Sequence, residues 1–359
     1  MKIAFVYAGG RESRWQDALA GRLPSDFFYG AVELARAGHE VSCIDAPEAN
    51  GSWLAAGYNA LFDRNAPART RGEHVVAVAR ALSRLHDVDA IVAASTSHAN
   101  ALARWKRNGR LRARLVGIHC GHVNFEIAVA RQRATARAMA CQDIVLFADS
   151  ERADTVRQFS ADPRRVHTAA FGVDVNFWTP APATREFVLS VGNDGRRDYA
   201  TMVSAVADLA APVKIVTARP LPQPLPPHVE HLRGSWHAPA VTDEGLRDLY
   251  RCALVTVVPL EDAIQPSGQS VALQALACGS PVVLTRTRGW WGGDDFADCL
   301  ELVEPRSPEA LRTAIQHVLN DGKARERMSL AAREAALAHG RIDTFAARLA
   351  DILATPSIS

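Results

Sequence analysis

The chain has 359 residues, of which 48% are hydrophobic, and a formal net charge of +2. This length exceeds what one hydrophobic core comfortably supports, so two domains are expected. The high apolar fraction and the near balance of charge exclude an intrinsically disordered chain and a strongly basic nucleic-acid binder. No apolar run approaches the roughly 18 residues that a transmembrane helix needs.

The first residues, MKIAFVYAGG, predict a strand that leads into a glycine turn. They lack the separate charged, apolar and cleavage regions of a secretory signal peptide, so a cytoplasmic protein is expected. The six cysteines lie far apart in the sequence, and no Cys-x-x-Cys pair is present. We therefore expect reduced cysteines and no zinc site.

Short apolar runs alternate with helical patterns along the first half of the chain. Strands are expected at 2–7, 41–44, 90–94, 115–119 and 144–148. Helix-like segments lie between them, such as DFFYGAVELARAG at 26–38. This alternation predicts a mostly parallel sheet with helices on both faces.

The segment FGVDVNFWTPAPATRE, 171–186, is rich in turn formers and prolines and predicts a connection between domains. The alternation restarts after it, with strands expected at 187–192, 213–217, 229–233, 254–258 and 281–285. Helical patterns at 307–319, 322–339 and 342–354 end the chain.

The expected fold class is therefore α/β, with two Rossmann-like doubly wound domains that face each other across a cleft. The expected boundaries are an N-terminal domain over 1–175, a linker over 176–186, a C-terminal domain over 187–340, and a final helix over 341–359 that can return to the N-terminal domain.

The stretch QPSGQSVALQALACGSPVV, 265–283, predicts a glycine-bearing turn, a buried helix and the start of a strand. The free backbone N–H groups near Gly268, Gln269 and Ser270, with the positive end of the helix dipole, would form an anion site. An ordinary helix cap is the alternative. The turn follows the strand expected at 254–258 at its carboxyl end, where ligands of such folds bind, and this position favours the anion site.

Four blocks of the chain resemble the retaining nucleotide-sugar glycosyltransferases of the GT-B fold, of the glycogen-synthase-like and phosphatidylinositol-mannosyltransferase-like group (glycosyltransferase family 4 type). The blocks are IVLFADSERADTVRQF, VHTAAFGVDVNFWTP, FVLSVGNDGRRDYATMVSA and VVPLEDAIQPSGQSVALQALACGSPVVLT. Each is weak alone, but their order and spacing are specific. The resemblance implies transfer of a sugar from a nucleoside diphosphate sugar, UDP or GDP, to an acceptor, without cofactor or metal.

The resemblance also implies site residues, with departures from the family pattern. The family's pair of glutamates falls on Ser267 and Gln274. Gln274 can still hydrogen-bond a ribose diol, whereas Ser267 is shorter and uncharged, so the identity of the sugar stays open. The family's two cations fall on Asn193 and Arg197, and Arg196 is adjacent. The guanidinium of Arg197 would neutralise the charge that grows on the leaving diphosphate.

In the N-terminal domain, His119 resembles the histidine that many relatives place against the donor sugar, and a packed or capping histidine is the alternative. Gly9 and Gly10 match the family's glycine-rich loop at the donor phosphate or the acceptor; an ordinary turn is the alternative. Acceptor-side candidates are Arg11, Glu12 and His122.

Trp236, next to Ser235, matches the region that flanks the nucleotide base in relatives, and a core tryptophan is equally expected. Trp290 and Trp291 are candidates for a sugar-stacking or lid element, with ordinary packing as the alternative.

Asp87-Val88-Asp89 spells the DxD string of other glycosyltransferases. It precedes the strand expected at 90–94 and therefore lies at the wrong end of the sheet, so a solvated turn is expected. The runs RWKRNGRLRAR, 104–114, and ARQRATAR, 130–137, are strongly basic. They predict a solvated face or, alternatively, peripheral contact with anionic lipid headgroups or an anionic acceptor.

Two other functions stay open at this point. One is a nucleotide-sugar epimerase of the same fold. The other is a non-catalytic nucleotide-sugar-binding protein, which the substitutions at Ser267, Gln274 and Asn193 suggest. No nucleic acid is expected as a partner, and neither the acceptor nor the oligomeric state can be inferred from the sequence.

Overall fold

The computed structural model describes residues 1–123, 126–234 and 238–356. The chain divides into two compact units, which are described separately below. The first consists of Met1–Ala170 together with Asp343–Ser359, and the second of Phe171–Ile342.

The first unit is built on a six-stranded sheet in the order β2-β1-β3-β4-β5-β6, with every neighbouring pair parallel. Because a parallel sheet is covered on both faces, its central strands are apolar runs, and β3 and β5 are buried at every residue. The strands are β1 (Lys2–Tyr7), β2 (Glu40–Asp45), β3 (Ala90–Ala93), β4 (Arg114–His119), β5 (Asp143–Leu146) and β6 (Val166–Thr168).

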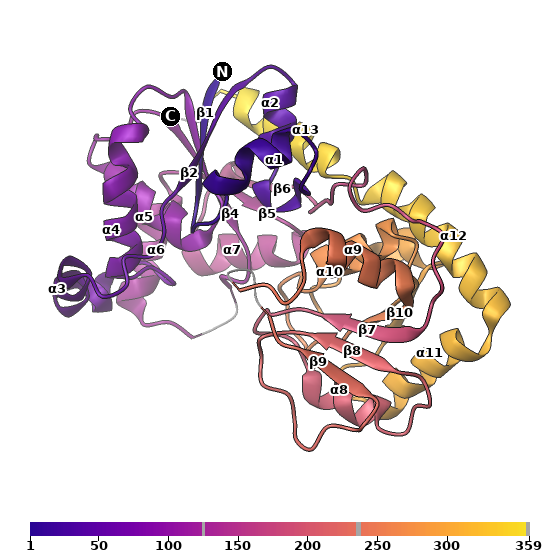
Figure 1. Cartoon of the computed structure of the whole chain (residues 1–359). Coiled ribbons are helices and arrows are strands. Elements are labelled where there is room, and N and C mark those ends of the chain that lie inside the picture. The colour runs from indigo at the N-terminus through magenta and orange to yellow at the C-terminus, as the bar shows by residue number, and fades with distance from the viewer. Residues whose placement is uncertain (124–125, 235–237, 357–359) are drawn as a thin grey trace. The chain divides into compact units, whose positions relative to one another are not determined.

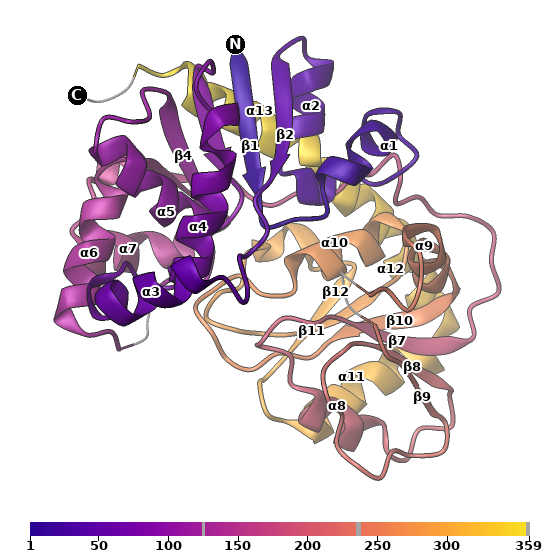
Figure 2. The same cartoon turned by 60° about the vertical axis from the view of Figure 1, so that its left-hand side comes forward.

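The helices of the first unit divide between the two faces of this sheet. Buried residues of α4, α5 and α6 form one core with β1, β3 and β4. Figure 2 shows these three helices together, with α3 at the end of α4. The helices are α1 (Trp15–Leu19), α2 (Ala31–Arg36), α3 (Trp53–Phe62), α4 (Gly72–Ala81), α5 (Thr96–Arg107), α6 (Val129–Met139), α7 (Arg152–Phe159) and α13 (Ile342–Ala354).

The C-terminal helix α13 completes the first unit and lies beside α2 (Figure 1). A Cβ atom placed on Gly30 would lie only 3.1 Å from the Cα atom of Ala346. Phe345 also packs near Phe147, which follows β5, with ring centroids 6.0 Å apart. The absence of a side chain at Gly30 therefore allows the close approach of the last helix.

The helix-like segment 26–38 is not one helix. It contains a 3-10 turn over Asp26–Phe28 and then α2, because Tyr29 and Gly30 adopt left-handed backbone angles, with φ of 51° and 84°. Left-handed residues interrupt a right-handed helix. The same contact with Ala346 explains why glycine stands at this break.

The second unit has a six-stranded sheet in the order β12-β11-β10-β7-β8-β9, again with every neighbouring pair parallel. This is the strand order of a doubly wound dinucleotide-type sheet, with its reversal point between β7 and β10. The strands are β7 (Phe187–Val191), β8 (Val213–Val216), β9 (Val229–Leu232), β10 (Ala253–Val258), β11 (Val282–Thr285) and β12 (Leu300–Val303).

Helices cover this second sheet as well. Buried residues of α8 and α11 form a core with β7, β8, β10 and β11, while α10 packs against α9 and α12. These helices are α8 (Tyr199–Val206), α9 (Asp243–Cys252), α10 (Gln269–Ala277), α11 (Pro308–Asn320) and α12 (Gly322–His339).

Part of the segment expected to connect the domains is firmly packed within the second unit. Trp178 is 1% exposed, and its ring lies 5.8 Å from that of Tyr250 on α9. Arg333 on α12 donates hydrogen bonds to the backbone oxygens of Val175 and Trp178. Residues 171–178 thus belong to the folded body of this unit.

The expected strands are present, and two further strands, β6 and β12, were not predicted. β6 has only three residues and β12 has two half-buried positions, so neither gives the continuous apolar signal of a central strand. All six cysteines are free. Within the described residues, no helix combines the length and hydropathy needed to cross a bilayer.

Candidate active site

The second sheet reverses its strand order between β7 and β10, so the loops after these strands lie at its ligand-binding edge. Residues 192–198 follow β7, and residues 259–268 follow β10. The two loops pair with each other through an isolated antiparallel bridge between Arg197 and Leu260. The Glu261 N–H also donates to the Arg196 carbonyl at 2.8 Å. Arg196, Arg197, Ser267 and Gly268 are therefore held on neighbouring loops.

Arg197 is the central charged group of this edge and is 5% exposed. Its Nε atom lies 2.7 Å from Oδ2 of Asp194, in an ion pair that lacks the angle of a directed hydrogen bond. Its Nη1 atom is buried and has no hydrogen-bond partner among the described residues. A buried guanidinium with an unused N–H group is suited to bind an additional anion.

Gly192 makes this position of the arginine feasible. It has a φ of +148°, and a Cβ atom added there would lie 2.2 Å from Nε of Arg197. The guanidinium thus packs directly on the backbone at the end of β7. Tyr199 supports the same turn, since its hydroxyl donates to the Gly192 carbonyl at 2.7 Å.

The start of α10 provides the second part of the predicted anion site. Gly268 precedes the helix with a left-handed φ of 78°, and as the N-cap residue it has no side chain with which to cap the first turn. The first N–H groups of a helix have no intrahelical acceptor, so those of Gln269 and Ser270 are available to a ligand. A Cβ atom on Gly268 would lie 2.7 Å from Val258, which shows how closely this turn packs on β10.

Leu260 connects the two parts of the site. Its backbone pairs with Arg197, and its side chain lies 3.4 Å from the position of a Cβ atom on Gly268. Leu260 therefore contacts both the loop that carries Arg197 and the turn that precedes α10. A cation and uncapped amides at one edge are the groups that would stabilise a diphosphate leaving group.

The other predicted donor residues have different surroundings. Ser267 accepts a hydrogen bond from the Gln265 side chain at 3.1 Å. Gln274 is 3% exposed, and its side-chain oxygen accepts from the Tyr250 hydroxyl. Arg196 lies at the surface, 3.8 Å from Glu261. Contact of these side chains with a nucleotide stays a prediction.

Asn193 has a structural role at the position where relatives carry a cation. Its Nδ2 atom donates to the Gly234 carbonyl at 3.1 Å, and its Oδ1 atom accepts from the Thr217 hydroxyl and the Ala218 N–H. The side chain thus joins the ends of three loops. Both polar atoms of its amide are engaged, which explains a neutral residue there.

In the first unit, the glycine turn after β1 is held by an acidic residue at the end of β2. Gly9 and Gly10 have φ of 138° and 75°, and Asp45 accepts hydrogen bonds from the N–H groups of Arg11 and Glu12. The Glu12 carboxylate in turn binds Arg84 at 2.7 Å. Both acceptor-side candidates of this loop therefore carry structural contacts.

His119 ends β4 and is fully buried. Its Nε2 atom lies 3.1 Å from Oε1 of Gln142, and Nδ1 has no hydrogen-bond partner among the described residues. Burial lowers the pKa of His119 to about 4, so the ring is neutral at pH 7. The packed alternative fits this geometry, because a ligand could reach the ring only after its surroundings moved.

His122 and Glu151 form a buried pair beside His119. Nδ1 of His122 lies 3.8 Å from Oε1 of Glu151, and Nε2 lies 2.9 Å from the Thr155 hydroxyl. Burial, together with nearby His119, holds the pKa of His122 well below its usual value. Burial raises the pKa of Glu151 to about 7, against the opposing effect of the Gly121 N–H that donates to it at 2.8 Å.

Sequence reasoning did not single out Glu151 or Gln142 as neighbours of these histidines. The one available signal for Glu151 is its place in ADSERAD, where polar residues directly follow the buried run of β5. Gln142 precedes β5 and carries no such signal. The register of β4 with β5 sets Leu146 beside His119, so it is the long Gln142 side chain that reaches the histidine.

The remaining candidate residues lie elsewhere in the sequence. Trp236 and Ser235 lie outside the described residues. Asp89 sits at the amino end of β3, as expected, and accepts a hydrogen bond from the Lys2 N–H at 2.7 Å. Trp290 and Trp291 pack on each other, with Phe296 5.3 Å from Trp291. The described residues contain no group of three or more metal-binding side chains.

Comparison with known families shows which protein family the second unit resembles. Residues 188–321, which include both loops of the candidate donor site, match the family model described as Glycosyl transferases group 1. The chain carries a group 1 glycosyltransferase domain. This agrees with the predicted resemblance and identifies the protein as a glycosyltransferase.

Solved structures support the fold of the whole glycosyltransferase. Sucrose-phosphate synthase from Thermosynechococcus elongatus is similar with a TM-score of 0.68 and 18% identity, over 98% of each chain. Anabaena HepE in complex with UDP-glucose has a TM-score of 0.67 and 15% identity, over 98% of this chain and 99% of that one.

A third similar structure is WaaG, a glycosyltransferase involved in lipopolysaccharide biosynthesis, with a TM-score of 0.62 and 15% identity, over 99% of this chain and 100% of that one. Such identities establish the fold alone, and they confirm the predicted GT-B architecture. Among curated protein sequences, none matches this chain.

Proposed function

We propose that this glycosyltransferase moves a sugar from a nucleoside diphosphate sugar to an acceptor, with retention of the anomeric configuration and without a metal ion. The observation that carries the proposal is the juxtaposition, through Leu260, of the buried Arg197 guanidinium and the uncapped start of α10. As the bond to the sugar lengthens, negative charge grows on the diphosphate. Arg197 and the amides of Gln269 and Ser270 would stabilise that charge.

The donor is proposed to be a UDP or GDP sugar. HepE, which shares the fold, was solved with UDP and with UDP-glucose, and this supports a nucleotide-sugar donor here. One preorganised donor to a developing negative charge is worth on the order of 3 kcal/mol in a transition state. Two amides and one guanidinium are therefore sufficient in principle to assist departure of the diphosphate.

The reaction is proposed to occur in the cytoplasm, with the acceptor held by the N-terminal unit. Peripheral contact with anionic lipid through 104–114 and 130–137 forms part of this proposal. The first run begins on the last turn of α5 and continues in the loop to β4, whereas the second lies on α6, which packs against α5 in the same unit. Basic residues near an anionic surface contribute about 1 kcal/mol each.

The first experiment is thermal melting of the purified protein with UDP, GDP, ADP and dTDP in turn. A ligand present at 100 times its Kd adds about 2.7 kcal/mol of stability. One diphosphate should raise the melting midpoint of the wild type, and Arg197→Ala should abolish that rise. Arg327→Ala is the matched control, since it removes an exposed arginine of α12 that belongs to neither loop of the site. Absence of a rise with every diphosphate would contradict a diphosphate site.

The second experiment assays turnover with the sugar donor that corresponds to the stabilising diphosphate. Release of free sugar or formation of a glycoside, unchanged by a metal chelator, is expected, and the anomeric configuration of the product reports retention. Sugar epimerisation without acceptor would instead identify an epimerase. Binding without any turnover would identify a non-catalytic binding protein.

A further inference from the structure

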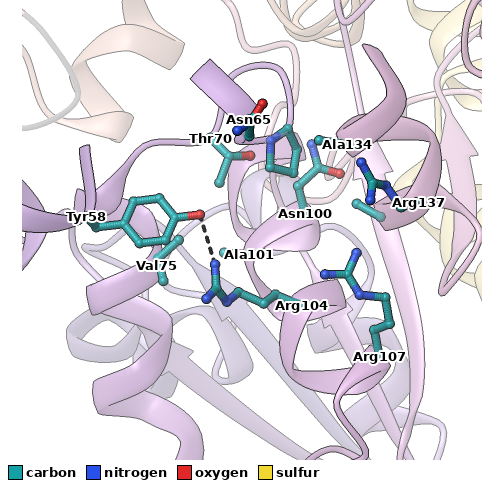
Figure 3. Close-up of a pocket in the computed structure, with 12 residues that line it drawn as sticks. Tyr58, Asn65, Thr70, Val75, Asn100, Ala101, Arg104, Arg107, Ala134 and Arg137 are labelled. Carbon is teal, nitrogen blue, oxygen red and sulfur yellow. Dashed lines mark hydrogen bonds between the residues drawn. The ribbon is translucent and has the colours of Figure 1, made fainter. Parts of the chain in front are cut away.

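The first unit contains a cavity that is separate from the strand ends described above. Its volume is about 410 Å³, which lies within the range of small-ligand sites. Its lining residues come from α3, α4, α5 and α6 and from the segment between α3 and α4 (Figure 3). Its lining residues are Tyr58, Asn65, Pro67, Thr70, Val75, Asn100, Ala101, Arg104, Arg107, Ala134, Arg137 and Ala138.

Three arginines converge on this cavity, and they come from both basic runs of the sequence. Arg104 and Arg107 extend from α5 and Arg137 from α6, as Figure 3 shows. The lining includes no acidic residue. None of the three forms an ion pair within the described residues, whereas Arg131, on the same helix as Arg137, pairs with Asp63 at 3.2 Å.

Like charges three residues apart on one helix face repel each other, so Arg104 and Arg107 are unfavourable neighbours in the absence of an anion. Arg104 is nevertheless held in place. Its Nη1 atom donates to the Tyr58 hydroxyl at 3.3 Å, and its guanidinium lies 5.4 Å from the Tyr58 ring and 5.6 Å from the Phe62 ring. Such positioning lowers the entropy cost of binding a ligand.

The floor of the cavity is polar and well ordered by hydrogen bonds. Asn100 and Thr70 are each 1% exposed. The Asn100 amide donates to the Ala68 carbonyl at 3.3 Å and accepts from Gln142 at 3.4 Å. Arg137 donates through Nε to the Arg133 carbonyl at 3.2 Å, which leaves its two terminal nitrogens for other partners.

We propose that this cavity, the arginine pocket, binds a phosphate group at a site distinct from the donor diphosphate. Three guanidinium groups without acidic partners offer planar pairs of N–H donors, and phosphate oxygens match such donors in charge and geometry. The inference does not rest on the proposed donor site, because the arginine pocket lies wholly within the first unit.

The phosphate can be carried by a soluble compound or by a lipid headgroup. The surface beside the pocket supports a lipid headgroup as the source of the phosphate. Trp53 and Leu61 on α3 are 80% and 75% exposed, and Leu54 and Phe62 on the same helix are also exposed. Tyr58 of this helix lines the pocket. Apolar side chains next to basic ones are typical of a surface that meets a membrane interface.

The first arm of the test titrates inorganic phosphate at constant ionic strength by calorimetry, in an Arg197→Ala background that disables the proposed donor site. Saturable binding is expected, and the double variant Arg107→Gln, Arg137→Gln should weaken it about tenfold or more. Arg112→Gln, Arg133→Gln is the matched control, since both arginines are exposed and lie outside the lining. Equal weakening by the control, or no saturable binding, would overturn the proposal.

The second arm measures sedimentation with phosphatidylcholine vesicles, with and without phosphatidic acid. For a lipid source, the protein pellets only with phosphatidic acid, the pocket double variant stays in solution, and Trp53→Ser, Leu61→Ser reduces pelleting while phosphate binding persists. For a soluble source, phosphate binds but the protein does not pellet. Pelleting that survives loss of both pocket arginines would contradict a headgroup in the pocket.

The nucleotide response separates this inference from the proposed function. The pocket double variant should keep the full stabilisation by the diphosphate that stabilises the wild type. Arg197→Ala should lose that stabilisation and keep phosphate binding. Each proposal can therefore fail while the other holds, and a pocket variant that loses the nucleotide response would show that the two sites are not distinct.

Discussion

The guanidinium of Arg197 rests on the backbone of Gly192, where a Cβ atom would lie 2.2 Å from its Nε atom. This contact joins the end of β7 to the only strongly buried arginine of the predicted donor residues. It explains both the burial of the charge and the need for glycine at a φ of +148°. The position of the proposed leaving-group cation thus depends on a residue without a side chain.

Gly192→Ala should displace Arg197 and weaken nucleotide binding about tenfold, because the added methyl group occupies the place of the guanidinium. The free energy of unfolding should fall by about 1–3 kcal/mol, the usual cost of overpacking with backbone strain. Gly195→Ala is the control, since nothing lies within 4 Å of its Cβ position in the same loop. Nucleotide titration and urea unfolding measure both effects. Equal nucleotide affinity in the two variants would refute a role of this contact.

Ser270→Pro should weaken diphosphate binding about tenfold, because proline removes one backbone N–H from the first turn of α10. Proline is tolerated in a first helical turn, so the fold should persist. Ser270→Ala keeps the N–H and removes only the hydroxyl, and it should bind like the wild type. Melting with the stabilising diphosphate measures the difference. If the alanine variant is impaired as much as the proline variant, the hydroxyl rather than the amide is responsible.

Glu151→Gln should change the dependence of stability on pH. Because burial raises the pKa of Glu151 to about 7 from 4.5, its contribution to stability is full below pH 4.5 and is lost as the pH rises through 7. The loss between pH 5 and pH 8 should be about 2 kcal/mol, and the glutamine variant should not show it. Urea unfolding at these two pH values measures the difference. A wild-type loss no larger than that of the variant would show that Glu151 is not a buried acid of raised pKa.

His119→Phe should change the pH dependence of stability in the opposite direction to Glu151→Gln. The pKa of His119 is lowered to about 4 from 6.5, so its contribution is full above pH 6.5 and is lost as the pH falls through 4. Between pH 7 and pH 5 the wild type should lose about 2 kcal/mol that the phenylalanine variant keeps. Urea unfolding at both values tests this. A ring resonance of His119 that titrates near 6.5 would contradict the burial of this histidine.

The alternation of apolar runs and helical patterns was sufficient to predict two parallel sheets, because a strand covered on both faces is mostly apolar. β3, β5 and β7 are examples, since every residue in them is buried. β12 escaped prediction because an edge strand with two half-buried positions lacks this signal. The break at Gly30 also escaped, because its cause is α13, more than 300 residues later in the chain.

The sequence by itself determined the fold class, the resemblance to glycosyltransferases and the two short motifs around Arg197 and Gly268. These features depend on local periodicity, glycine placement and the order of motifs, all of which are written along the chain. The tertiary structure alone decided which side chains remain available to bind a ligand. Asn193 and Glu12 are engaged in hydrogen bonds, His119 is buried beside Gln142, and two basic runs meet in one pocket. Burial and partnership depend on contacts between segments distant in sequence, so no local pattern can specify them.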